Sequence, residues 1–408
     1  MQNKFNRVVD FKYNKQFRRF GNRNFISFFL LSLSISDFIL VLQLVIIKKW
    51  FNSNLGYGTS ITGRVGRMNY ISLGKSGLKV SAVGFGGIPI IRLQTGEAVK
   101  VLRHAFDRGI TFYDTANMYR DSEAKIGQAL SRLRDKIIIA TKTTQRTAEG
   151  FRQNLENSLK AMKTDYIDLY QFHQVANDEE WGKIKQEGGA WGEAQKAMRE
   201  GKIRFLGVSS HNLQMAVKLA KTGLFSSVQF PFNFIEQEAK DELHKYCREE
   251  GIATIVMKPF AGGVIDNGAL AFKYLRQFSD IIPIPGFDSE KSIDEIISIY
   301  EHPNDITGHD LELMEKYRQE LGKVFCRRCE YCQPCPNGVL ITPAMGYPIV
   351  ASRMSPKVSI EFLKAPMEST QLCDECGLCI EKCPYNLPIP DLLKKNYDLF
   401  ETHRSRQD

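Results

Sequence analysis

The sequence predicts an α/β protein in which a (β/α)8 barrel, the TIM-barrel architecture, precedes a small cysteine-rich domain. From Val80 onward, short runs of β-branched and aromatic residues alternate with amphipathic stretches, which is the pattern of repeated β-α units. Eight such units can be counted along the 408-residue chain, which has room for a barrel of about 250 residues and further modules. Eight of the nine cysteines fall between Cys326 and Cys383.

Each unit contributes one expected strand. The expected strands are 80–86, 112–116, 137–142, 166–173, 203–209, 227–232, 252–260 and 281–286. A closed barrel fits better than an open nucleotide-binding sheet, because the first β-α turn, which begins at Gly84, lacks the G-x-G-x-x-G spacing. We therefore expect an N-terminal extension over 1–67, the barrel over 68–301, a linker helix over 302–325 and the cysteine-rich domain over 326–408.

The formal charge of +9 is concentrated at the N-terminus. Residues 1–67 hold eleven Lys and Arg against two acidic residues, and the rest of the chain is balanced. A nucleic-acid-binding protein needs a basic face, and the neutral body gives no sign of one. We therefore expect no nucleic-acid partner.

Residues 25–47 form an apolar run with one charge, Asp37, long enough to span a bilayer. Seven basic residues precede the run and four follow it, so an anchor would place the rest of the chain outside the cytoplasm. The alternatives are a cleaved targeting peptide and a start at Met68 that leaves 1–67 out of the mature protein. Eight closely spaced cysteines indicate thiolates that bind metal and must stay reduced, so we expect a cytoplasmic protein, with membrane association through 25–47 left open.

Four polar residues lie at the carboxyl ends of three consecutive expected strands, where barrels carry their chemistry. They are Asp114, Tyr119, Lys142 and His173. Taken singly, each has an ordinary structural explanation, but together they fit carbonyl reduction. Tyr119 would protonate the developing alkoxide, Lys142 would favour its phenolate, Asp114 would hold Lys142, and His173 would orient the substrate oxygen.

These residues lie in motifs that resemble the aldo-keto reductases. The segments that carry the resemblance are 73–87, 114–119, 140–142, 168–173 and 207–210. The resemblance covers residues 68 to about 301 and implies a (β/α)8 barrel, hydride transfer from NADPH, and the catalytic tetrad above. It also implies that Ser209, Ser210 and Gln229 contact the nicotinamide amide, although the family usually has Asn at the position of Ser210.

The chain departs from the family after the eighth expected strand. Many members carry a Lys-Ser pair and then an Arg there, which bind the 2'-phosphate of NADPH, whereas this chain has Gly286, Phe287 and Ser292. Because that phosphate is recognised by positive charge, the choice between NADPH and NADH is open, with NADPH favoured. Gly286 remains an expected cofactor contact.

The cysteine-rich tail resembles a two-cluster bacterial ferredoxin. Its two runs are Cys-x2-Cys-x2-Cys-x2-Cys-Pro and Cys-x2-Cys-x2-Cys-x3-Cys-Pro, formed by Cys326, Cys329, Cys332, Cys335, Cys373, Cys376, Cys379 and Cys383. The resemblance implies two 4Fe-4S clusters, and that the fourth cysteine of each run ligates the other run's cluster. Two zinc sites are the alternative, but zinc sites usually come as separated Cys-x2-Cys pairs. Cys247 stands alone and is expected to be a structural thiol.

Three functions fit these features. The first is an oxidoreductase that interconverts an aldehyde or ketone and its alcohol with NADPH or NADH. The second is an electron-transfer protein that passes electrons from nicotinamide to a redox partner protein. The third is a nicotinamide-sensing regulatory subunit. No flavin motif is visible that would convert a hydride into single electrons.

Overall fold

The computed structural model describes residues 68–354 and 356–406 and confirms the predicted barrel. Eight strands follow one another in a single sheet, each parallel to its neighbours. They are β3 (Phe85–Gly86), β4 (Phe112–Asp114), β5 (Ile138–Thr143), β6 (Ile167–Phe172), β7 (Ile203–Ser209), β8 (Ser227–Pro231), β9 (Ala253–Met257) and β10 (Ile281–Pro283).

The first and last strands meet and close the barrel. The amide of Gly84 donates to the carbonyl of Pro283 at 2.9 Å, and that of Gly86 to Pro285 at 2.7 Å. Gly86 and Gly286 form a parallel bridge at this seam. A Cβ on Gly286 would lie 2.5 Å from Cγ of Pro89, so only glycine fits the closure.

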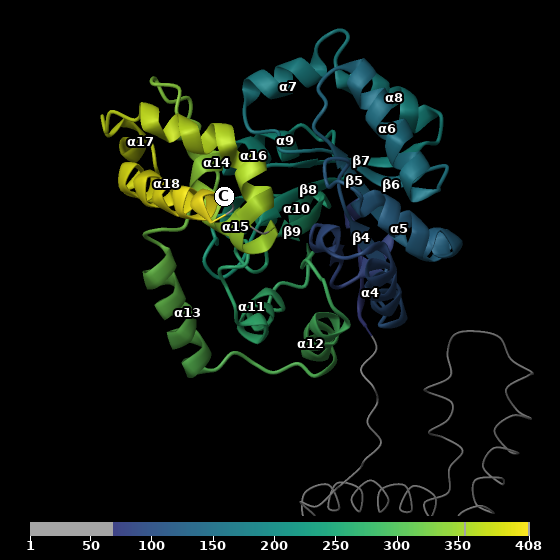
Figure 1. Ribbon diagram of the computed structural model, residues 1–408. Coiled ribbons are helices and arrows are strands. Elements are labelled where there is room, and N and C mark those ends of the chain that lie inside the picture. The colour runs from purple at the N-terminus through teal and green to yellow at the C-terminus, as the bar shows by residue number, and fades with distance from the viewer. Residues whose placement is uncertain (1–67, 355, 407–408) are drawn as a thin grey trace, which may run out of the picture. The chain divides into compact units, whose positions relative to one another are not determined.

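Helices cover the outside of the strands (Figure 1). Their apolar faces pack with outward-facing strand residues such as Tyr113, Ile139 and Val208 in one large core. The barrel helices are α4 (Thr95–Asp107), α5 (Ser122–Leu130), α6 (Ala148–Met162), α7 (Asp178–Lys185), α8 (Ala190–Arg199), α9 (Leu213–Lys221), α10 (Lys245–Glu250), α11 (Gly268–Leu275) and α12 (Glu290–Glu301). Shorter turns are η1 (Gly74–Ser76), η2 (Pro89–Arg92), η3 (Ser131–Lys136) and the π-helix η4 (Lys240–His244).

The expected first strand, 80–86, is wrong in part. Its first half belongs to an antiparallel hairpin of β1 (Tyr70–Ser72) and β2 (Lys79–Ser81), and only β3 enters the barrel. Leu73, Leu78 and Val80 of the hairpin segment pack against inward-facing residues near the amino ends of the strands, such as Phe112 and Ala253. The hairpin therefore closes the amino-terminal end, which leaves the carboxyl ends of the strands for a site.

After α12, the chain continues through α13 (Gly308–Leu321) into a helical, cysteine-rich region. Its elements are α14 (Ile341–Met345), α15 (Tyr347–Met354), α16 (Pro356–Ser369), η5 (Thr370–Leu372), α17 (Leu378–Glu381) and α18 (Ile389–Ser405). Figure 1 shows α14 to α18 gathered beside the barrel. They share a small core of their own that includes Tyr347, Leu363 and Phe400.

The predicted apolar segment 25–47 lies outside the described residues and stays a prediction. Within residues 68–354 and 356–406, no helix reaches the length and apolarity that a membrane crossing requires.

Candidate active site and cluster-binding cysteines

A buried ion pair lies at the carboxyl ends of β4 and β5. Nζ of Lys142 donates to Oδ1 of Asp114 and to the carbonyl of Thr115, both at 2.6 Å. Parallel pairing of the two strands brings the side chains together, since Asp114 stands beside Ala140 in the register and Lys142 follows two residues later on the same face. Two of the three N–H donors of Lys142 are thereby used, and the third remains available.

The second oxygen of Asp114 accepts two amide hydrogen bonds. Nε2 of Gln171 lies 3.1 Å away and Nε2 of Gln229 lies 3.0 Å away. Gln171 was missed by the sequence reasoning, although its place two residues before His173 puts it on the inward face of β6. The two glutamines fix the orientation of the carboxylate that holds Lys142.

Tyr119 and His173 lie beside the Asp114–Lys142 ion pair. Their rings meet edge to face with centroids 5.8 Å apart, and Nζ of Lys142 lies 5.4 Å from the centroid of the Tyr119 ring. The structure thus brings together all four residues that the sequence singled out for catalysis: Asp114, Tyr119, Lys142 and His173.

Burial sets the protonation of these groups. It lowers the pKa of Lys142, against the opposing effect of Asp114, and it raises the pKa of Tyr119, with a further rise from the Asp114 charge. The pKa of His173 lies well below its usual range, because of burial and then the cations Lys142, Arg146 and Lys258. At neutral pH, Tyr119 therefore holds its proton and His173 is neutral. The direction for Tyr119 is opposite to the acidification expected from Lys142, because burial and the Asp114 carboxylate outweigh the ammonium.

The residues expected to contact the cofactor lie in or just after β7, β8 and β10. Oγ of Ser209 accepts from the amide of Gln174 at 2.9 Å, which leaves its own proton available to a ligand. Oγ of Ser210 donates to the carbonyl of Val175, in the loop after β6, at 2.8 Å. Gly286 lies at the barrel seam, and Phe287 is buried against Phe85 with ring centroids 5.4 Å apart.

The eight tail cysteines line two hollows. One hollow is lined by Cys326, Cys329, Cys332 and Cys383. The other is lined by Cys335, Cys373, Cys376 and Cys379, and Cys332 lies at its border as well. Apart from that shared residue, the fourth cysteine of each run lies with the first three of the other run.

The two cysteine runs have the same backbone pattern. The second residue after the first cysteine has a positive φ in both runs, 60° at Arg328 and 60° at Glu375. The residue directly after the second cysteine does so too, 66° at Glu330 and 79° at Gly377. A non-glycine residue in this conformation is uncommon, so three of them at matching places indicate equivalent ligand-binding turns.

The donor set of the first hollow fits an iron-sulfur cluster. Burial, together with the neighbouring Cys326, Cys329 and Cys383, raises the pKa of Cys332 to about 12. The raised pKa values of Cys326, Cys329 and Cys332 oppose ionisation of these thiols, whereas a cluster is ligated by thiolates and its iron supplies the balancing positive charge. Among the described residues, no three His, Cys, Asp or Glu side chains are arranged to hold a single metal ion.

Cys247 lies apart from both cysteine sets. It is buried in α10, and burial raises the pKa of its thiol to about 11. A structural role agrees with this environment.

A closed parallel barrel with its polar rim at the strand carboxyl ends, joined to a cysteine-rich helical domain, defines a (β/α)8 protein with an iron-sulfur module. Residues 82–271 match the aldo/keto reductase family, and residues 325–387 match a 4Fe-4S dicluster domain. The barrel belongs to the aldo/keto reductase family, and the chain is an oxidoreductase of that type.

Named relatives agree with this assignment. The chain is 29% identical over 250 residues to the probable aldo-keto reductase 1 of Glycine max, an alignment covering 57% of this chain and 70% of that protein. It is 31% identical over 215 residues to L-galactose dehydrogenase of Arabidopsis thaliana, covering 48% and 66%. An aldo-keto reductase of Bacillus halodurans in its holo form has the same fold, with a TM-score of 0.52 and 22% identity over 61% of this chain and 96% of that one.

Proposed function

We propose that this chain reduces an aldehyde or ketone with the hydride of NADPH, or oxidises the alcohol in the reverse direction. The observation that carries the proposal is the buried Asp114–Lys142 pair directly beside Tyr119 and His173. A bound nicotinamide cofactor would supply the hydride. Ser209, Ser210 and Gln229 are the proposed contacts of its nicotinamide amide, and Gly286 is a further proposed contact of the cofactor. The test is carbonyl turnover by anaerobic, cluster-loaded protein, with Tyr119→Phe as the diagnostic variant.

Residues of the protein would donate the proton that the reduced substrate oxygen needs. When the carbonyl carbon gains a hydride, its oxygen becomes an alkoxide and takes the proton of the Tyr119 hydroxyl. Lys142 would use its remaining N–H donor to stabilise the resulting phenolate, which offsets the raised pKa of Tyr119. Neutral His173 would donate a hydrogen bond to the substrate oxygen and hold it near Tyr119.

Arg92 would supply a positive charge for the 2'-phosphate of NADPH. The residues after the eighth strand do not supply one. Its guanidinium lies 2.7 Å from Asp288, next to Ser289, which caps α12. We expect Arg92→Ala to raise the KM for NADPH about tenfold, because an exposed arginine–phosphate contact is worth about 1 to 2 kcal/mol, and to leave the KM for NADH unchanged. Steady-state kinetics with both cofactors measure this. Equal effects on the two cofactors would exclude Arg92 from 2'-phosphate recognition.

We propose that the tail holds two 4Fe-4S clusters, in a chain divided into a barrel over 68–301, a linker over 302–325 and a cluster domain over 326–408. Cys326, Cys329, Cys332 and Cys383 would bind one cluster, and Cys335, Cys373, Cys376 and Cys379 the other. Each hollow is lined by cysteines from both runs, and this supports the crossed assignment.

Cys383→Ala tests the crossed assignment. We expect it to lose or convert the cluster of the first run, about half of the iron, although Cys383 belongs to the second run in sequence. Iron and sulfide analysis and visible absorption of anaerobic protein measure the loss. Cys247→Ala is the matched control and should keep all of the iron. A Cys326→Ala/Cys383→Ala protein should lose no more iron than Cys383→Ala alone, because both cysteines would ligate the same cluster; loss of all the iron in this double variant would contradict the assignment.

A second function, electron transfer between nicotinamide and a redox partner protein, is favoured by one contact. Nδ2 of Asn212, two residues after Ser210, lies 3.4 Å from the carbonyl of Cys329, and its Oδ1 accepts from the Tyr331 hydroxyl at 3.2 Å. The proposed nicotinamide loop thus contacts the loop of the first cluster. Cluster reduction by NADPH that survives in Tyr119→Phe would support this function over carbonyl reduction.

A further inference from the structure

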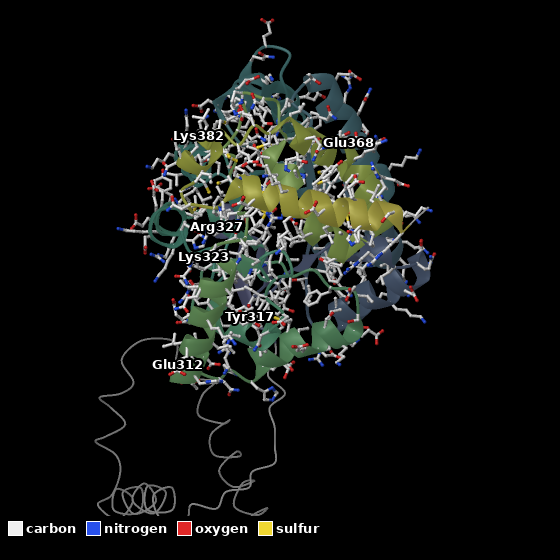
Figure 2. All side chains as sticks on the ribbon, turned by 60° about the vertical axis from the view of Figure 1, so that its left-hand side comes forward. Glu312, Tyr317, Lys323, Arg327, Glu368 and Lys382 are labelled. Atoms are coloured by element: carbon white, nitrogen blue, oxygen red, sulfur yellow. The ribbon has the colours of Figure 1, made fainter. Side chains whose placement is uncertain are left out.

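The first cysteine loop places an arginine at the mouth of the barrel. A Cβ on Gly262, in the loop after β9, would lie 3.5 Å from Nη2 of Arg328. Arg328 therefore lies over a barrel loop, although it belongs to the cluster domain. Its neighbour Arg327 points elsewhere, stacking on Tyr385 at 3.7 Å and pairing with Glu238 at 3.2 Å. Figure 2 shows Arg327 just beyond Lys323, where the chain leaves α13.

Several polar atoms at this mouth are buried without a hydrogen-bond partner among the described residues. They are Nε and Nη2 of Arg328, Nε2 of His211 and Nδ1 of His173. The pKa of His211 lies well below its usual range because of burial and then the charges of Lys258, Arg328 and His173, so His211 lies within reach of these charges. Buried polar atoms are nearly always hydrogen-bonded, so these unpartnered nitrogens indicate a ligand site.

The nearby carboxylates are engaged elsewhere. Asp114 is held by Lys142 and the two glutamines described above, and Glu180 pairs with Arg146 at 3.1 Å. Arg328 has no ion pair with a carboxylate among the described residues, and its nearest aromatic contact is Phe325, at 5.9 Å. A planar guanidinium with unused donors matches the geometry of a carboxylate or phosphate.

We propose that the substrate is a carbonyl compound that carries an anionic group, a carboxylate or a phosphate, and that Arg328 and His211 bind this group. The inference rests on the proposed function, since Tyr119 and His173 would bind the carbonyl oxygen beside it. It also gives the cluster domain a role in the substrate site: a loop that the first cluster orders would supply the anion-binding residue.

Anion binding can be measured without turnover. Cluster-loaded protein with saturating NADP+ is titrated by calorimetry with oxamate, the amide analogue of a 2-oxo acid, and separately with inorganic phosphate. We expect at least one of these to bind, and Arg328→Gln to weaken it by about tenfold to a hundredfold, the worth of a charge-assisted hydrogen bond. Arg327→Gln is the matched control and should leave the affinity unchanged, with iron content and spectrum equal to wild type in both variants.

Substrate pairs test the same inference through specificity. Pyruvate is compared with methyl pyruvate, and glyceraldehyde 3-phosphate with glyceraldehyde, since each pair differs in the anionic group. Wild type should favour the charged member of at least one pair, and Arg328→Gln should abolish that preference. If these four compounds and a broader panel of aldehydes and ketones all remain unreduced but an anion still binds through Arg328, the proposed function fails and the anion site stands.

Three results would overturn the inference. The first is that neither oxamate nor phosphate binds, or that both variants bind them like wild type. The second is weaker NADP+ binding in Arg328→Gln with unchanged anion binding, which would assign Arg328 to the cofactor. The third is a shifted cluster reduction potential with unchanged anion binding, which would make Arg328 a counter-charge for the cluster.

Discussion

Replacing Tyr119 with Phe should lower kcat for carbonyl reduction by about a hundredfold to ten-thousandfold, the usual contribution of a positioned acid. The phenylalanine ring keeps the edge-to-face contact with His173, so the site should keep its shape. Only the hydroxyl that supplies the proton is removed. KM should change little, because the lost interaction acts mainly in the transition state.

The measurement is steady-state turnover of a panel of aldehydes and ketones with NADPH, alongside cofactor binding by fluorescence. Tyr170→Phe is a suitable control, because Tyr170 is a buried tyrosine of the same barrel that faces the helices instead of the mouth. Turnover by Tyr119→Phe at the wild-type rate would mean that another group donates the proton. His173 is a poor candidate, since its lowered pKa keeps it neutral.

Replacing Lys142 with Met should destabilise the fold as well as abolish turnover. Both partners of the Lys142–Asp114 pair are buried, and removing one leaves the other charge without compensation, at a cost of about 3 to 5 kcal/mol. For a barrel of this size, the thermal midpoint should fall by roughly 6 to 20 °C.

The double variant Lys142→Met/Asp114→Asn separates stability from catalysis. It contains neither charge, so most of the lost stability should return while turnover stays absent. Thermal unfolding followed by circular dichroism, with iron content checked in each variant, measures the first part. A double variant less stable than Lys142→Met alone would show that the ion pair is not the source of the destabilisation.

The strands of the barrel could be predicted from the sequence, whereas the first hairpin could not. The eight parallel strands and the meeting of Asp114, Lys142 and His173 follow from strand spacing, because the carboxyl ends of parallel strands share one rim. The expected strand 80–86 was wrong in part. Its alternating apolar residues fit a hairpin strand and a barrel strand equally well, and only backbone pairing distinguishes them.

Contacts between segments that are distant in the chain could not be predicted from the sequence. Arg92 and Asp288 are separated by 196 residues, and Asn212 and Cys329 by 117, so no local pattern connects them. The position of Gln171 could have been predicted, because side chains along β6 alternate between the inside and the outside of the barrel.

The sequence by itself determined the barrel, the rim residues and the two cysteine runs, because strand periodicity and ligand spacing are properties of neighbouring residues. Only the tertiary structure decided that the hairpin closes the amino end and that Arg328 lies at the barrel mouth, within reach of the charge on His211. Those arrangements depend on packing between segments that are distant in the chain, and such packing leaves no periodic signal in a single sequence.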